Sequence, residues 1–121
     1  DSMIGAKHPL LCMMVPHMLT AWPGVRFVRV IRPASESSRS LSRLRWFPPE
    51  RCRNVPAELV AARDAALESK SAVKCTDLNF ADLLSEPATQ VDRLIASIGI
   101  RPTAAQRAAA IAFPQRELAT A

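Results

Sequence analysis

Residues 26–33 have the sequence RFVRVIRP, and they carry the clearest strand signal in the chain. Its β-branched and aromatic side chains predict a strand over 26–31, which Pro33 ends. An apolar run at the end of a strand is typical of a parallel sheet covered on both faces. A second short strand is expected at Ala72-Val73-Lys74-Cys75. Because helical segments separate the two strands, the pattern is that of a parallel crossover unit, and the expected fold class is α/β.

Hydrophobic periodicity and end signals predict helices around these strands. The expected ranges are 9–20, 35–46, 55–70, 79–84, 87–98 and 103–113. The first is apolar around most of its circumference, so we expect it to be buried, with His17 as a hydrogen-bonded core residue. Asn54 is the expected cap of the third helix, and Thr103 forms a capping box with Gln106 at the start of the last. Gly99 is the expected stop of the fifth.

The length of the chain bounds the number of domains. A chain of 121 residues is long enough for one modest core, so we expect residues 1–121 to form a single domain. An apolar content of 49% argues against disorder. Two parallel strands make only a marginal sheet, and the expected helix at 9–20 begins almost at once. We therefore expect a segment upstream of Asp1, or a second chain, to complete the sheet.

The positive charge is concentrated in one part of the chain. The net charge is +5, and eight of the thirteen arginines fall between Arg26 and Arg53. Only Glu36 and Glu50 oppose them within that stretch. A basic surface of this kind favours a negatively charged partner, either a nucleotide or a nucleic acid.

Cysteine usage and hydropathy predict a cytoplasmic protein. Cys12, Cys52 and Cys75 are odd in number, and no pair has CxxC spacing, so we expect packed, reduced thiols rather than a metal site or a disulfide. The apolar stretch 9–19 is too short to span a bilayer. It also lacks the charged start and small-residue cleavage site of a signal peptide.

Arg32 stands where an open parallel sheet binds its ligand. It directly follows the expected strand 26–31 and precedes a helix, and ligands of such sheets bind beyond the carboxyl ends of the strands. A helix N-terminus favours phosphate, and an arginine adds a bidentate fork. Ser40, eight residues on, adds a hydroxyl. A second interpretation stays open from the spacing alone, in which Arg32 pairs with a carboxylate and Ser40 is an ordinary helix residue.

Residues 27–41, FVRVIRPASESSRSL, resemble the segment that binds the nucleotide 3′-phosphate in sulfotransferases of the P-loop type. In that family a hydrophobic strand ends in an arginine, often followed by proline, and a serine comes eight residues after the arginine. Arg32 and Ser40 match this pattern position for position. Two further segments are similar to the family, GAKHP at 5–9 and TDLNFADLLSEP at 76–87. The resemblance extends over about residues 4–113.

The resemblance implies a co-substrate and a reaction. The family transfers a sulfuryl group from 3′-phosphoadenosine 5′-phosphosulfate to an acceptor hydroxyl or amine without a metal, and Arg32 and Ser40 match its 3′-phosphate contacts. In the better-known members, a histidine near the position of His8 removes the acceptor proton, and a lysine near that of Lys7 stabilises the departing phosphate. Many bacterial-type members have another residue at the histidine position. His8 is therefore either the general base or a cap of the following helix.

The resemblance also shows what the 121 residues lack. The family's donor site needs a glycine-containing phosphate loop with a lysine, whose backbone N–H groups cradle the 5′-phosphosulfate. The chain has only Gly5, Gly24 and Gly99, and none stands in such a loop. We therefore expect the C-terminal part of a P-loop-type three-layer fold, dependent on a missing N-terminal half or a second chain for transfer. Arg116 is the candidate for the family's basic C-terminal contact to the 3′-phosphate, although the accompanying glycine is missing.

Two other functions stay open from the sequence. A non-catalytic basic module would bind nucleic acid or another protein through residues 39–53, in which five arginines lie beside Trp46 and Phe47. No helix-turn-helix, zinc or RNA-binding signature accompanies this run. A structural fragment without activity is the remaining alternative.

Overall fold

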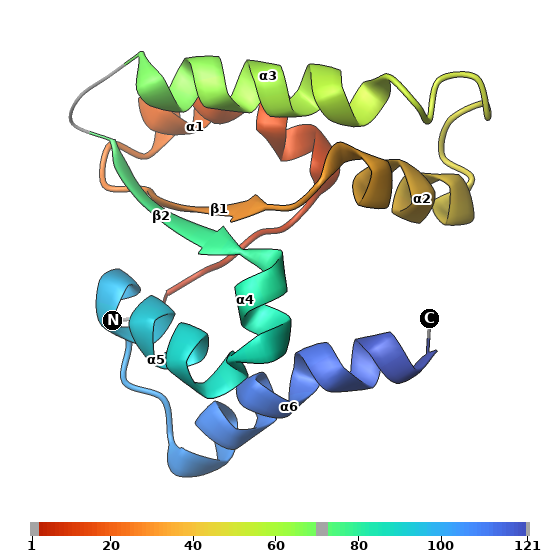
Figure 1. The fold of residues 1–121 in the computed structure, drawn as a ribbon. Helices are drawn as coiled ribbons and strands as arrows, with labels where there is room; N and C mark the ends of the chain where they lie inside the picture. Colours follow the sequence, from red (N-terminus) through yellow and green to blue (C-terminus); the bar gives the residue numbers. More distant parts are fainter. Residues whose placement is uncertain (1–2, 70–72, 121) are drawn as a thin grey trace. The chain divides into compact units, whose positions relative to one another are not determined.

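The computed structural model describes residues 3–69 and 73–120, and it has a mixed α/β architecture. Two strands, β1 (Arg26–Ile31) and β2 (Lys74–Asn79), lie side by side and run in parallel (Figure 1). The chain passes between them through α2 (Ala34–Leu44) and α3 (Val55–Glu68), because parallel strands need a long crossover connection. The α/β class and the parallel pairing are confirmed, and the three-layer P-loop fold stays a prediction.

The chain forms two compact units that interleave along the sequence. Unit 1 consists of Asp1–Val25 and Pro33–Lys74, and unit 2 consists of Arg26–Arg32 and Cys75–Ala121. Besides α2 and α3, unit 1 holds η1 (Pro9–Met13) and α1 (Val15–Ala21). Besides the paired strands, unit 2 holds α4 (Phe80–Ser85), α5 (Pro87–Ile98) and α6 (Ala104–Thr120). Because each unit combines two separate segments, neither is a contiguous stretch of sequence.

Apolar packing holds unit 1 together. Helix α3 packs on η1, α1 and α2. Leu41, Val55 and Leu59 form the buried cluster between these helices, and Cys12 and Phe47 pack against it. The core of unit 1 is therefore built by α3, which contributes two of the three buried residues.

The ends of α2 and α3 differ slightly from the predicted ranges. Both helices overlap the predicted ranges 35–46 and 55–70. Helix α2 begins one residue early, at Ala34, and each helix ends two residues early, at Leu44 and Glu68. Arg45 ends α2 with a φ of 54°, a left-handed conformation that usually requires glycine. Asn54 occupies the cap position of α3, but its side chain makes no cap hydrogen bond, so the predicted capping is wrong.

The first predicted helix, 9–20, is wrong in two respects. It is divided into the 3₁₀ helix η1 and α1, because Pro16 has no N–H to donate to the carbonyl four residues earlier. The segment is also largely exposed, since Met13 and Met14 face solvent and Val15 is its buried residue. His17 is exposed as well, so its assignment to the core is wrong.

The second strand lies further along the chain than the sequence predicts. Of the expected residues 72–75, Ala72 lies outside the described residues, and β2 continues to Asn79. The extension contains the polar residue Asp77, which pairs with β1. Nε and Nη2 of Arg29 donate to the Asp77 carboxylate over 2.7 and 2.8 Å. Leu78 is buried in the same stretch. Cross-strand pairing thus makes a strand where the local strand signal is weak.

The helix ends of unit 2 follow the sequence more closely. Helix α5 ends at Gly99, whose φ is 72°. Before α6, the backbone N–H of Thr103 donates to the Gln106 side chain over 2.9 Å, and that of Gln106 donates to the Thr103 hydroxyl over 3.2 Å. The glycine stop and the capping box are therefore confirmed. Helix α6 continues beyond its predicted end, through the buried Pro114.

Two features bear on the cellular setting of the chain. Cys52 is buried and Cys12 and Cys75 are half-buried, so all three thiols are packed as expected. Burial is the main cause that raises the pKa of the Cys12 and Cys75 thiols above the ordinary value, which disfavours the reactive thiolate. In residues 3–69 and 73–120, no helix combines the length and apolar character needed to cross a bilayer.

Candidate functional site

Arg32 lies at the carboxyl edge of the two-stranded sheet in unit 2. It directly follows β1, and Phe80 directly follows β2, so the parallel pairing brings both residues to the same edge. The guanidinium carbon of Arg32 lies 4.4 Å from the centroid of the Phe80 ring. A cation over an aromatic face is attracted to it even when partly desolvated. This contact holds a half-buried arginine at the edge where open parallel sheets bind ligands.

Polar contacts fasten the middle of β2 to α5. Nη2 of Arg93 donates to the backbone carbonyl of Asp77 over 2.6 Å and to the side-chain oxygen of Gln90 over 3.0 Å. The hydroxyls of Thr76 and Ser97 share a short hydrogen bond. These contacts fix β2 against α5 within unit 2. Phe80 thus directly follows a strand that is fixed in place, with no loop between them.

Phe80 is the functional candidate that the sequence reasoning missed. The available signal was its place directly after the second strand, where it stands opposite Arg32. Its helix, α4, begins there because the side-chain oxygen of Asn79 accepts the backbone N–H of Ala81 over 2.9 Å. The cap ends the strand and turns the chain, which brings the ring to the sheet edge.

The other residues of the predicted donor site belong to both units. Ser40 is half-buried in α2 of unit 1, so its place beside Arg32 stays a prediction. Lys7 is exposed in the segment before η1. Arg116 is exposed on α6 of unit 2, next to Gln115, whose side-chain amide donates to a carbonyl of α4 over 3.0 Å. Within unit 2, the structure thus brings Arg32 to Phe80, and the 3′-phosphate contact of Arg116 stays a prediction.

His8 caps η1. Its Nδ1 accepts the backbone N–H of Leu10 over 3.2 Å, so the cap interpretation of this residue is confirmed. The imidazole also stacks on the indole of Trp46, with ring centroids 5.1 Å apart and planes inclined by 10°. A neutral imidazole whose Nδ1 accepts carries its proton on Nε2, which then donates. Proton removal by His8 therefore requires the cap bond to open, and the general-base assignment stays a prediction.

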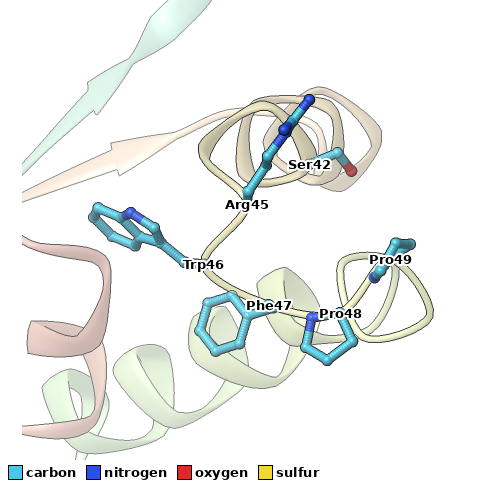
Figure 2. A pocket seen from close by; sticks show the side chains of 6 residues that line it. All are labelled: Ser42, Arg45, Trp46, Phe47, Pro48 and Pro49. Atoms are coloured by element: carbon cyan, nitrogen blue, oxygen red, sulfur yellow. The ribbon is translucent and has the colours of Figure 1, made fainter.

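A second group of side chains forms a pocket in unit 1 (Figure 2). The pocket has a volume of about 500 Å³ and is lined by Ser42, Arg45, Trp46, Phe47, Pro48 and Pro49. The first two come from the end of α2 and the others from the loop that follows it. The Trp46 indole extends away from the two prolines and is 51% exposed. An arginine and an accessible aromatic ring therefore both line this pocket.

Comparison with known proteins identifies no relative: no protein-family model, no curated protein and no solved structure matches the chain significantly. Function is therefore inferred from the chain's own side chains. The Arg32–Phe80 contact in unit 2 and the pocket lined by Arg45 and Trp46 in unit 1 are the candidate sites.

Proposed function

We propose that Arg32 binds the 3′-phosphate of 3′-phosphoadenosine 5′-phosphosulfate, or of the product 3′,5′-ADP, as part of a sulfotransferase-like donor site. The observation that carries the proposal is the Arg32–Phe80 contact at the carboxyl edge of the parallel sheet. An arginine held there offers a planar fork of N–H donors that matches phosphate oxygens. The likeness of residues 27–41 and 76–87 to sulfotransferases supports the identity of the nucleotide.

The remaining residues have supporting tasks in this proposal. Ser40 donates a hydroxyl hydrogen bond to the same phosphate, and Arg116 adds a second cation. Lys7 stabilises the departing phosphate. As the acceptor oxygen or nitrogen bonds to sulfur and the bond from sulfur to the 5′-phosphate oxygen breaks, His8 takes the acceptor proton, after its cap bond has opened. Transfer needs a glycine-rich loop for the 5′-phosphosulfate, and the 121-residue sequence contains none.

The variant Arg32→Gln tests the phosphate contact. The chain and the variant are titrated calorimetrically with 3′,5′-ADP and with 5′-AMP, which lacks the 3′-phosphate. A charge-assisted hydrogen bond contributes roughly 1.5–3 kcal/mol, so the affinity for 3′,5′-ADP should fall by about 10- to 150-fold. The affinity for 5′-AMP should change by less than about twofold, because this nucleotide has no 3′-phosphate for the arginine to bind.

Arg101→Gln is the matched control, because Arg101 is exposed between α5 and α6 and its replacement removes the same charge. It should leave both affinities unchanged. Phe80→Leu removes the aromatic face while keeping an apolar side chain, and it should weaken 3′,5′-ADP binding less than Arg32→Gln. Equal weakening of both nucleotides by Arg32→Gln, or an equal effect of Arg101→Gln, contradicts the assignment.

A further inference from the structure

Five arginines surround the loop between α2 and α3 in unit 1. They are Arg39, Arg43, Arg45, Arg51 and Arg53, and all are exposed. Together with Trp46 they form what we call the basic surface. The first two lie one helical turn apart on α2. The hydroxyl of Ser38 donates to the backbone carbonyl of Arg53 over 3.4 Å, which returns the end of the loop to α2 beside Arg39.

Carboxylates neutralise little of this charge. Arg51 lies 3.6 Å from Glu58, and both side chains of that pair are largely exposed. The other four arginines of the basic surface form no ion pair within the part of the chain that the structure describes. Like charges gathered on one surface repel one another until an anion neutralises them. Charge complementarity therefore favours a partner that carries several negative charges along its length.

Trp46 adds an aromatic platform to these charges. Its indole is 51% exposed, although it already stacks on His8. That stack fixes the plane of the indole, so a further ring that packs on it meets a small entropic cost. Nucleic acid bases stack on such exposed rings without strong preference for one base.

The backbone of Arg45 supports a functional interpretation of the same place. Its φ of 54° lies in the left-handed region, where a side chain is unfavourable and glycine is usual. Arg45 nevertheless stands there, and it lines the pocket beside Trp46 (Figure 2). Strained positions of this kind concentrate at binding sites, because function retains a side chain that stability disfavours.

We propose that the basic surface binds single-stranded nucleic acid, with the arginines on successive phosphates and Trp46 stacked on a base. The pocket of about 500 Å³ beside Trp46 is where the stacked base would lie. A duplex keeps its bases stacked on one another and offers none to the indole. The surface should therefore prefer a single strand to a duplex of the same length. This proposal does not depend on the sulfotransferase-like function of Arg32.

Trp46→Leu tests the stacking contact. Affinity for a fluorescein-labelled oligothymidylate of about 12 nucleotides is measured by anisotropy, and it should fall by about 5- to 150-fold in this variant. Trp22→Leu is the matched control, since Trp22 is 64% exposed and lies outside the basic surface. The control should bind within about twofold of the original chain.

The control variant also gives a direct reading of the contact. The chain has two tryptophans and no tyrosine, so in Trp22→Leu the fluorescence of the protein reports on Trp46. The oligonucleotide should quench that fluorescence as binding saturates. If Trp46→Leu is unfolded by circular dichroism, Trp46→Phe replaces it, and a phenyl ring should give an intermediate affinity.

Arg43→Gln tests the phosphate contacts against Arg101→Gln, which removes the same charge outside the basic surface. For a single strand, the slope of log affinity against log salt changes by about 0.7 for each phosphate that the protein no longer neutralises. Arg43→Gln should reduce the slope by about this amount, and Arg101→Gln should leave it unchanged.

Three further ligands test which feature of the nucleic acid the basic surface binds. A duplex of the same length offers no unstacked base, and heparin carries charge without bases. Both should bind more weakly than oligothymidylate. Oligouridylate separates RNA from DNA, and tighter binding of either one supports the proposal. Equal affinity for duplex or heparin, or unchanged oligonucleotide affinity in Trp46→Leu, overturns it and leaves a general polyanion or acidic-protein surface.

Discussion

Units 1 and 2 use arginine in different ways. In unit 2, arginines hold elements together: Arg29 binds the Asp77 carboxylate across the sheet, and Arg107 binds the Asp92 carboxylate between α5 and α6. In unit 1, the apolar cluster around Leu59 holds the helices, while five arginines stay exposed on α2 and in the loop that follows it. A count of charged residues therefore does not separate the arginines that bridge elements through carboxylates from those that stay exposed to solvent.

The two units also end helices differently in the same backbone conformation. Gly99 ends α5 with a φ of 72°, and Arg45 ends α2 with a φ of 54°. Glycine has no Cβ and adopts this region without penalty, whereas other residues are destabilised there by roughly 1–2 kcal/mol. The residue that caps α5 in unit 2, Gly99, therefore suits its conformation. The residue that caps α2 in unit 1, Arg45, is disfavoured there and lines a pocket.

The largest expected effect concerns the apolar cluster of unit 1. Leu59→Ala should lower the free energy of unfolding by about 2–5 kcal/mol, because the removed side chain is buried and leaves a cavity. Urea unfolding measures this change, and hydrogen exchange assigns it to the amides of α2 and α3. Val60→Ala is the control, since the neighbouring Val60 is 37% exposed. A comparable decrease in that control would show that apolar burial does not distinguish the two positions.

Exchanging the cap residues should shift stability in opposite directions. Gly99→Ala should lower the free energy of unfolding by about 1–2 kcal/mol, since alanine is disfavoured at a positive φ. Its Cβ would also approach Nη1 of Arg26 to 3.1 Å. Arg45→Gly should raise the free energy of unfolding by up to about 1 kcal/mol while weakening oligonucleotide binding. Thermal melts and the anisotropy titration measure the two effects.

Gly24→Ala is the control for the cap exchange, because a Cβ added there meets no atom within 4 Å and the backbone has no positive φ. Its effect on the melting temperature should be small. Two outcomes would contradict the comparison of the caps. One is a loss of stability in Arg45→Gly, and the other is a gain in oligonucleotide affinity in the same variant.

The smallest expected effect is the pH dependence of an exposed ion pair in unit 2. Hydrogen bonds from Arg107 lower the pKa of Asp92 below its ordinary value of 3.8. A carboxylate with a lowered folded-state pKa stabilises the fold above about pH 3.8, and this contribution is lost as the pH falls through the folded-state value. A carbon-detected NMR titration should therefore give a midpoint below 3.8 for Asp92.

In Arg107→Gln, the midpoint of Asp92 should return to about 3.8, and raised salt should shift it the same way in the original chain. Arg107→Gln should change the stability of unit 1 little, because Arg107 and Asp92 both lie in unit 2 and neither belongs to the unit 1 core. A midpoint unmoved by either treatment would mean that the two side chains do not associate in solution.

Local sequence signals predicted what depends on local structure. The first strand, the place of Arg32 after it, the stop at Gly99 and the capping box at Thr103 depend on neighbouring residues alone, so all four were predictable. The extension of β2 was not, because it depends on Arg29 reaching Asp77 from the other strand. The contacts at the candidate sites were missed for the same reason, since they also join residues far apart in the sequence.

Two such contacts stand out. Phe80 becomes part of the Arg32 site only when parallel pairing brings the two strand ends together. The stack of His8 on Trp46 joins the segment before η1 to the loop after α2, and nothing in either segment alone indicates it. The division of the first helix, by contrast, was predictable, because Pro16 could not donate within a continuous helix.

The interleaving of the two units has a consequence for the order in which the protein is made. Ribosomes release the chain from its N-terminal end, so both segments of unit 1 are complete before residues 75–79 of β2 emerge. Unit 1 can then pack its core while β1, already synthesised, still lacks its partner strand. During that interval β1 presents an unpaired edge with Val28, Val30 and Ile31, a template for strands of other nascent chains. The yield of soluble protein should therefore depend on how fast the ribosome passes residues 75–79.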